Sequence, residues 1–288
     1  MGFSSVDDLI SEMSAGKTWR ADWNKITGAG AYTAGRWYDL SLLAGTPIAN
    51  TYSGTALNAQ NPSDATWGLY HGGNVSADTK HIINASAYTA VATAVPAVLM
   101  LVDVCLYYPG ISLNSASAQN MTNTNTLSRY TDGVGLRAFM TVTTQSGATA
   151  HNIAMSYTDA AGNASNTLPV TVACTASAIV GHITHSGTAA NNYGPFLPLA
   201  AGDTGIRSVQ SVTISATSGA GVGCLVLAKP LLTLPITTVS VAAERDLVNQ
   251  LPSMPRVVDG ACLTWLYFAG AATAASTNFY GGVEFAWG

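Results

Sequence analysis

Charge is what this sequence has least of. Asp, Glu, Lys and Arg make up 9% of its 288 residues, against about 25% in ordinary soluble domains. The eleven Lys and Arg are scattered, form no basic run and leave a net charge of −4, which argues against a nucleic-acid partner. Ala, Thr, Ser, Asn and Gly replace the missing charges, and so neutral a surface is typical of a protein that is buried in an assembly.

Long uninterrupted apolar runs are also absent. The longest apolar stretch, 87–108, is broken by Pro96 and Asp103, so we expect a buried strand pair there and no transmembrane span. The first thirteen residues carry Asp7, Asp8 and Glu12, where a secretory signal would need basic and then apolar residues. The sequence therefore predicts no membrane partner and folding in a reducing cytoplasm.

Cysteine and histidine pairs with the spacing of metal ligands are missing. Four cysteines lie in apolar segments without a CxxC pair, at Cys105, Cys174, Cys224 and Cys262. This context predicts four buried thiols. The one close histidine pair is His182 and His185, and residues three apart in a strand point to opposite faces. We therefore expect no metal site.

Nucleotide-binding and catalytic motifs are incomplete. Gly16-Lys17-Thr18 resembles the end of a phosphate-binding loop, but Ser11 occupies the place of the required glycine. Gly28-Ala29-Gly30 lacks the third glycine of a dinucleotide fingerprint, because Thr33 stands there. There is no GxSxG motif, and the spacing of the carboxylates pairs none of them. We expect no cofactor, no catalytic residue and no enzyme activity.

The N-terminal region differs in composition from the rest. Residues 4–14 predict a helix, capped by Ser5, whose apolar side chains share one face. From Lys17 to Tyr88 the chain is loop-rich and holds four of the six tryptophans. Within it, 78–84 reads as a short helix or turn, and the Gly-Gly of 70–74 as a functional loop or, as we favour, a tight turn.

Aromatic side chains in such a segment suit two roles. They either anchor contacts to neighbouring subunits or form a small core covered by loops. The residues that we expect to carry intersubunit contacts are Trp19, Trp23, Arg36, Trp37, Tyr38, Trp67 and Tyr70.

Strand follows strand from Tyr88 onward, and one unit is weakly repeated. In 127–144 an Asp and a Gly lead into an aliphatic residue, Arg137 and an alternating strand, and 203–212 repeats the scheme with Arg207. Pro230, Pro235, Pro252 and Pro255 predict a polyproline-like connection. We predict an all-β, antiparallel sandwich, of jelly-roll or immunoglobulin-like type, with an N-terminal helix and an extended aromatic-rich arm.

The expected organisation has three ranges. Residues 1–87 are the helix and the loop-rich arm, 88–176 the first β-unit and 177–288 the second. The two β-units are compatible with a single shared sandwich.

Four stretches resemble tailed-bacteriophage virion structural proteins of the capsid-associated, cement type: 36–42 (RWYDLSL), 68–75 (GLYHGGNV), 128–133 (SRYTDG) and 284–287 (EFAW). This resemblance implies a non-enzymatic β-sandwich module in the virion, assembled in the host cytoplasm, that binds and stiffens the capsid lattice. It also implies a homo-oligomer with other capsid proteins as partners.

Two other functions remain open. At 288 residues the chain is larger than many decoration proteins, which leaves a role as a major shell or tail subunit open. A carbohydrate- or receptor-binding β-module would place aromatic side chains at the tips of loops between strands, whereas here they cluster in the N-terminal part.

Overall fold

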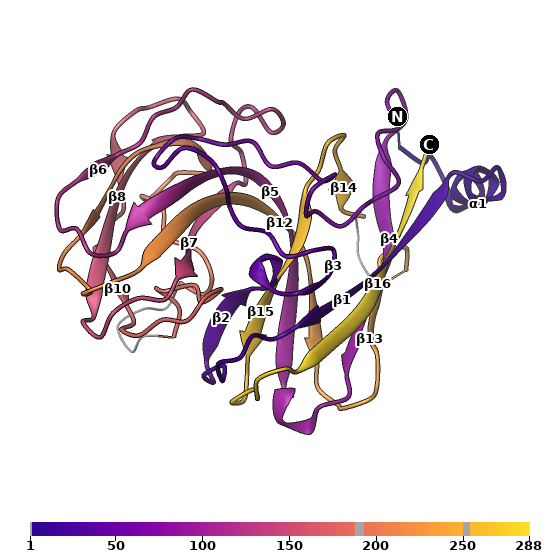
Figure 1. Cartoon of the computed structure of the whole chain (residues 1–288). Helices are drawn as coiled ribbons and strands as arrows, with labels where there is room; N and C mark the ends of the chain where they lie inside the picture. Colours follow the sequence, from indigo (N-terminus) through magenta and orange to yellow (C-terminus); the bar gives the residue numbers. More distant parts are fainter. Residues whose placement is uncertain (1, 188–192, 250–253) are drawn as a thin grey trace.

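The computed structural model describes residues 2–187, 193–249 and 254–288. It confirms an all-β, antiparallel fold with one N-terminal α-helix, α1 (Val6–Ser14), among the described residues. Figure 1 shows two lobes side by side, with α1 and both chain ends at the outer edge of one lobe. The strands of the described residues form three sheets.

The sheet of the lobe that carries α1 has six strands in the order β13-β4-β16-β1-β3, with β14 also paired to β4. Its strands are β1 (Thr18–Ile26), β3 (Gly45–Thr46), β4 (Lys80–Thr89), β13 (Ala243–Asp246), β14 (Arg256–Val257) and β16 (Asn278–Trp287). One face of this sheet packs on the first hydrophobic core, which includes Trp23, Phe279, Val283 and Phe285.

The sheet of the other lobe has the order β10-β8-β11-β6, with β9 also paired to β8. Its strands are β6 (Gln119–Asn120), β8 (His151–Asp159), β9 (Asn166–Thr167), β10 (Val172–Cys174) and β11 (Ile206–Ile214). On β8 every second residue is buried, from His151 to Asp159, so one face covers the second core and the other faces solvent.

The central sheet has the order β2-β15-β5-β12-β7 and joins the lobes. Its strands are β2 (Arg36–Asp39), β5 (Ala97–Ser112), β7 (Arg137–Thr144), β12 (Val222–Ile236) and β15 (Leu263–Ala269). β5 and β12 are long enough to run through both lobes (Figure 1). Leu99 and Leu234 lie in the first core, and Leu106 and Leu227 in the second. Three register shifts between β5 and β12 redirect their side chains on the way.

Residues 181–184 bridge the two edges of the central sheet. Asp39 N–H of β2 donates to Gly181 O at 2.7 Å, and Val142 N–H of β7 donates to His182 O at 3.0 Å. The curled sheet and this non-strand segment together form a ring. A third core fills the ring with Tyr52, Trp67, Val104, Phe139, Ile183, Cys224 and others. The four cysteines are free thiols and buried, as predicted.

Helix α1 follows the sequence prediction closely. The Asp8 backbone N–H donates to Ser5 Oγ at 3.1 Å and caps the helix. Leu9 is its one buried side chain and packs near Ile83 and Ala286 of the sheet.

The N-terminal region holds more strands than its composition suggested. Residues 80–84, expected in a short helix or turn, begin β4 instead, because Ile82 is drawn into the first core. Strands from residues 1–87 pair with strands from 177–288, as in β1 with β16, so the sheets combine the three sequence ranges.

The predicted polyproline-like connection was wrong at Pro230 and Pro235. Pro252 lies outside the described residues, and Pro255 directly precedes β14. Pro230 and Pro235 both lie within β12. The pairing of β12 with β7 ends at Ala228, so that beyond it β12 pairs on one side only, with β5. Proline is accepted there because its missing N–H removes no ladder hydrogen bond from an edge.

Candidate interaction site

Three of the predicted contact residues lie inside the protein. Trp23, Tyr38 and Trp67 are 3%, 1% and 7% exposed. The centroid of the Trp23 ring lies 5.0 Å from that of the Trp265 ring, and the Tyr38 side chain is almost completely buried. In this conformation these side chains build the cores.

Two further predicted residues are half-buried. The Trp37 ring lies 5.3 Å from that of Phe268 and packs against the third core. Arg36, at the start of β2, is also half-buried. Neither belongs to the group formed by the remaining two.

Trp19 and Tyr70 form an exposed aromatic pair. Trp19 lies on β1 and Tyr70 on the loop before β4, and their side chains are 41% and 52% exposed. The rings meet edge to face, with centroids 5.2 Å apart and an interplanar angle of 84°. The indole Nε1–H of Trp19 also donates to Tyr70 O at 3.1 Å. The pair is thus fixed in orientation although it faces water.

The glycines after Tyr70 make this arrangement possible. Gly72 and Gly73 have φ of +87° and +76°, a region that L side chains rarely adopt. A Cβ on Gly72 would lie 2.9 Å from the Trp19 side chain, so a larger residue would push the indole away. The Gly-Gly turn therefore brings its backbone against Trp19 of the same chain.

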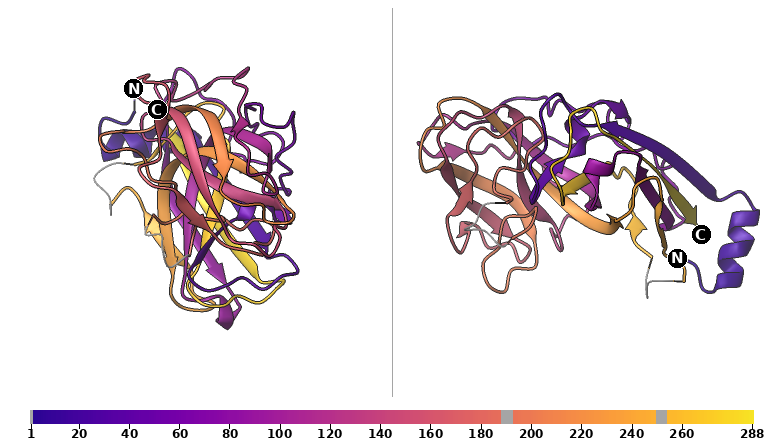
Figure 2. Two further views of the ribbon diagram at one scale, coloured as in Figure 1. Left: turned by 90° about the vertical axis from the view of Figure 1, so that its left-hand side faces the viewer. Right: turned by 90° about the horizontal axis from the view of Figure 1, so that it is seen from below.

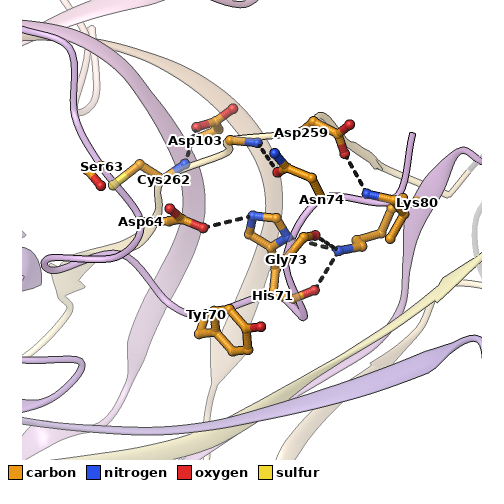
Figure 3. Close-up of polar contacts among 12 residues, drawn as sticks. Ser63, Asp64, Tyr70, His71, Gly73, Asn74, Lys80, Asp103, Asp259 and Cys262 are labelled. Atoms are coloured by element: carbon orange, nitrogen blue, oxygen red, sulfur yellow. Dashed lines mark hydrogen bonds and ion pairs between the residues drawn. The ribbon is translucent and has the colours of Figure 1, made fainter. Parts of the chain in front are cut away.

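The side chain of a buried lysine holds the loop by hydrogen bonds to His71 and Gly73 (Figure 3). Lys80 of β4 is 2% exposed. Its Nζ lies 3.0 Å from His71 Nδ1, and donates to His71 O at 2.7 Å and to Gly73 O at 2.5 Å. These three acceptors use all three ammonium donors. Burial lowers the pKa of Lys80 to about 8.

His71 extends this group to a carboxylate. Because its Nδ1 accepts from Lys80, the imidazole carries its proton on Nε2, which lies 3.5 Å from Asp64 Oδ2. Burial, and then the charge of Lys80, lower the pKa of His71. A neutral imidazole beside an ammonium avoids a second buried positive charge.

A second carboxylate fixes the far end of the loop. Asp259 accepts from the backbone N–H groups of Val75 and Ser76 at 2.9 and 3.2 Å, and Asn74 Oδ1 accepts from Gly260 N–H at 2.8 Å. The loop is thus held at both ends by side chains of neighbouring elements (Figure 3).

This arrangement is suited to positioning rather than to chemistry on a substrate. Lys80 and His71 are buried, and the donors of the Lys80 ammonium are engaged within the protein. Among the described residues no group of three or more His, Cys, Asp and Glu is placed to hold a metal ion. The part of this arrangement that is exposed to solvent is the Trp19–Tyr70 pair.

Sequence reasoning missed the polar groups that support the site. Lys80 and Asp64 lie sixteen positions apart in the chain, and no spacing rule connects them. The same holds for the buried ion pair of Arg129 and Asp103, in which Nη2 lies 2.7 Å from Oδ1. Lys80 stands between Thr79 and His81, ahead of the apolar pair 82–83, so its neighbours in the sequence gave no sign that it is buried.

Comparisons with known proteins add little. No protein-family model matches the chain, and no curated protein matches its sequence. Weak structural neighbours are structures of a virus. The infectious bursal disease virus Gt strain gives a TM-score of 0.19 at 8% identity, over 94% of this chain and 79% of that chain. The VP2 subviral particle of the same virus gives a TM-score of 0.19 at 8% identity, over 93% of this chain and 80% of that chain. TM-scores of this size do not indicate a shared fold.

No described helix is both long and apolar enough to cross a membrane.

Proposed function

We propose that this chain is a non-enzymatic structural protein of a bacteriophage virion, and that it binds and stabilises the capsid lattice through contacts between subunits. The observation that carries the proposal is the Trp19–Tyr70 pair. Large aromatic side chains dominate the energy of protein interfaces because they bury much area at little entropic cost. Here two of them are held exposed and in fixed orientation.

The composition of the chain supports the same role. Only 9% of its residues are charged, which suits a protein whose surface is covered by neighbours. The resemblance of four stretches to capsid-associated phage proteins points in the same direction. Of the seven residues predicted as contacts, Trp19 and Tyr70 are those with side chains available to a partner.

Co-expression with the shell protein encoded in the same genome tests the proposal. The full chain should sediment with assembled shells, and the double variant Trp19→Ser, Tyr70→Ser should remain in the supernatant. Tyr88→Ser is the matched control, because Tyr88 is 39% exposed on β4 and stacks on Tyr280 away from the pair.

The outcomes separate the candidate roles. Absence of the unaltered chain from the shell fraction overturns the proposal. Closed particles formed by the chain alone would make it a major shell subunit. Shell binding that the double variant retains would remove the aromatic pair from the mechanism.

A further inference from the structure

Helix α1 carries an apolar face that the described residues leave largely uncovered. Val6, Leu9, Ile10 and Met13 share one side of the helix by their spacing, yet Leu9 alone is buried. Val6, Ile10 and Met13 are 58%, 55% and 38% exposed. The helix thus rests on the sheet by one edge of its apolar side.

So few packing contacts stabilise a helix of this length only weakly. Nine residues form it, fewer than the ~12–15 below which an isolated helix is marginal in water. Helices of proteins gain most of their stability by packing an apolar face. Among the described residues, Phe3, Val248 and Met254 pack near Leu9, whereas Val6 and Ile10 stay more than half exposed.

An apolar pocket of about 400 Å³ lies at the other end of β1. Its apolar lining includes Ile26, Tyr32, Leu42, Leu43, Ile179 and Val180. Val180 is 39% exposed. The volume falls within the ~300–1,000 Å³ of sites that bury small ligands, so the pocket has room for several aliphatic side chains. No Asp, Glu, Lys or Arg is among its lining residues.

The helix and the pocket of one chain cannot meet. β1 begins four residues after α1 and ends at Ile26 of the pocket. Its nine residues span eight Cα-to-Cα steps, which separate the helix from the pocket by about 26 Å at ~3.3 Å per step. Figure 1 shows the same separation, with α1 at the upper right and β1 running from it to the lower left.

We infer that the apolar face of α1 inserts into the pocket at Ile26–Val180 of a second copy of this chain. One chain offers two uncovered apolar features of matching character, at opposite ends, on a surface poor in charge. A contact between different patches of two copies is heterologous and generates a ring or a continuing chain of subunits. This inference rests on the proposed function, and names the partner that α1 meets within the lattice.

Crosslinking between two cysteine variants tests the contact. Ile10→Cys and Val180→Cys are purified separately in the full chain, mixed, and treated with a short bis-maleimide. The four native thiols are buried and do not react in the folded protein. The mixture should give a dimer on denaturing gels, and each variant treated alone should stay monomeric.

Light scattering measures the same contact without a crosslinker. Ile10→Ser and Val180→Ser should each weaken self-association by about tenfold or more, since either removes an apolar side chain from the interface. Val170→Ser is the matched control. Val170 is 45% exposed in the lobe that lacks α1, and its variant should associate like the unaltered chain.

Three results would overturn the inference. A dimer from Ile10→Cys alone would show a symmetric pair of helices. Equal self-association of Ile10→Ser and the unaltered chain would exclude α1 from the contact. A monomer at all concentrations that still sediments with shells would refute the contact between copies and leave the proposed function standing. A chain that self-associates as inferred but never sediments with shells would support the contact between copies and refute the proposed function.

Discussion

Single buried polar side chains decide where the exposed aromatic pair sits. The Lys80 ammonium satisfies two backbone oxygens and one imidazole nitrogen of the loop that carries Tyr70. Left without that donor, three acceptors would be buried and unpaired, each at a cost of about 1–3 kcal/mol. The surface feature is therefore set by a residue that no partner can touch.

Replacing Lys80 by Met should release this loop. We expect a loss of about 3 kcal/mol or more in the free energy of unfolding, from three unpaired acceptors, measured by urea denaturation. The Trp19 ring, which lies over Gly72, should become more exposed, seen as a red shift of tryptophan emission. Lys17→Met is the control, because the ion pairs of Lys17 lie at the surface and are worth about 0–1 kcal/mol each. Equal losses in the two variants would contradict this account.

At the scale of elements, the bridge formed by 181–184 is sensitive to acid. His182 and His185 are 1% exposed, and burial lowers the pKa of each to about 3. The charge of Arg36 acts in the same direction on His182. An unfolded histidine titrates near 6.5. Between pH 6.5 and 3 the unfolded chain therefore binds more protons, so stability falls as the pH falls through this window.

Acidification from pH 7 to 5 should cost about 2 kcal/mol of unfolding free energy for each of these two histidines. His71, His81 and His151, whose pKa values burial also lowers, add in the same direction. The check is the urea midpoint at several pH values. His182→Gln should reduce the slope of stability against pH by one histidine's share, whatever its effect at pH 7. An unchanged slope would contradict the assignment.

Local pattern predicted those elements whose side chains alternate or share a face. The helix expected within 4–14 and the alternating strand that starts at Arg137 follow directly from spacing. β4 and the proline-containing half of β12 did not, because their conformation is decided by which strand lies alongside. Trp23 and Tyr38 were expected at a contact surface, and they lie in a core. An aromatic side chain serves either place, and only tertiary packing distinguishes them.

Of the candidate site, the sequence supplied the two exposed rings and the Gly-Gly turn. Lys80, Asp64 and Asp259 could not be found in this way, since each acts on residues brought near by the pairing of β4 and the loops around it.

The whole molecule is tied together by strands that both lobes share. Residues of β5 and β12 contribute to the first core at one end and to the second core at the other. Neither lobe retains its core when these strands leave it. The two lobes should therefore unfold in one cooperative step.

Calorimetry tests this cooperativity. Leu99→Ala in the first core and Ile153→Ala in the second should each lower the same single transition, because both side chains are fully buried and such truncations cost about 2–5 kcal/mol. Two resolved transitions, with each variant shifting only one of them, would show that the lobes are independent.

The two long central strands also set how the protein bears force. A pull that separates the lobes acts along β5 and β12, whose hydrogen bonds run across the strands. Sliding one strand past the other strains these bonds together, whereas peeling an edge breaks them in turn. A load that draws the two lobes apart would therefore act along the mechanically strongest direction of the protein.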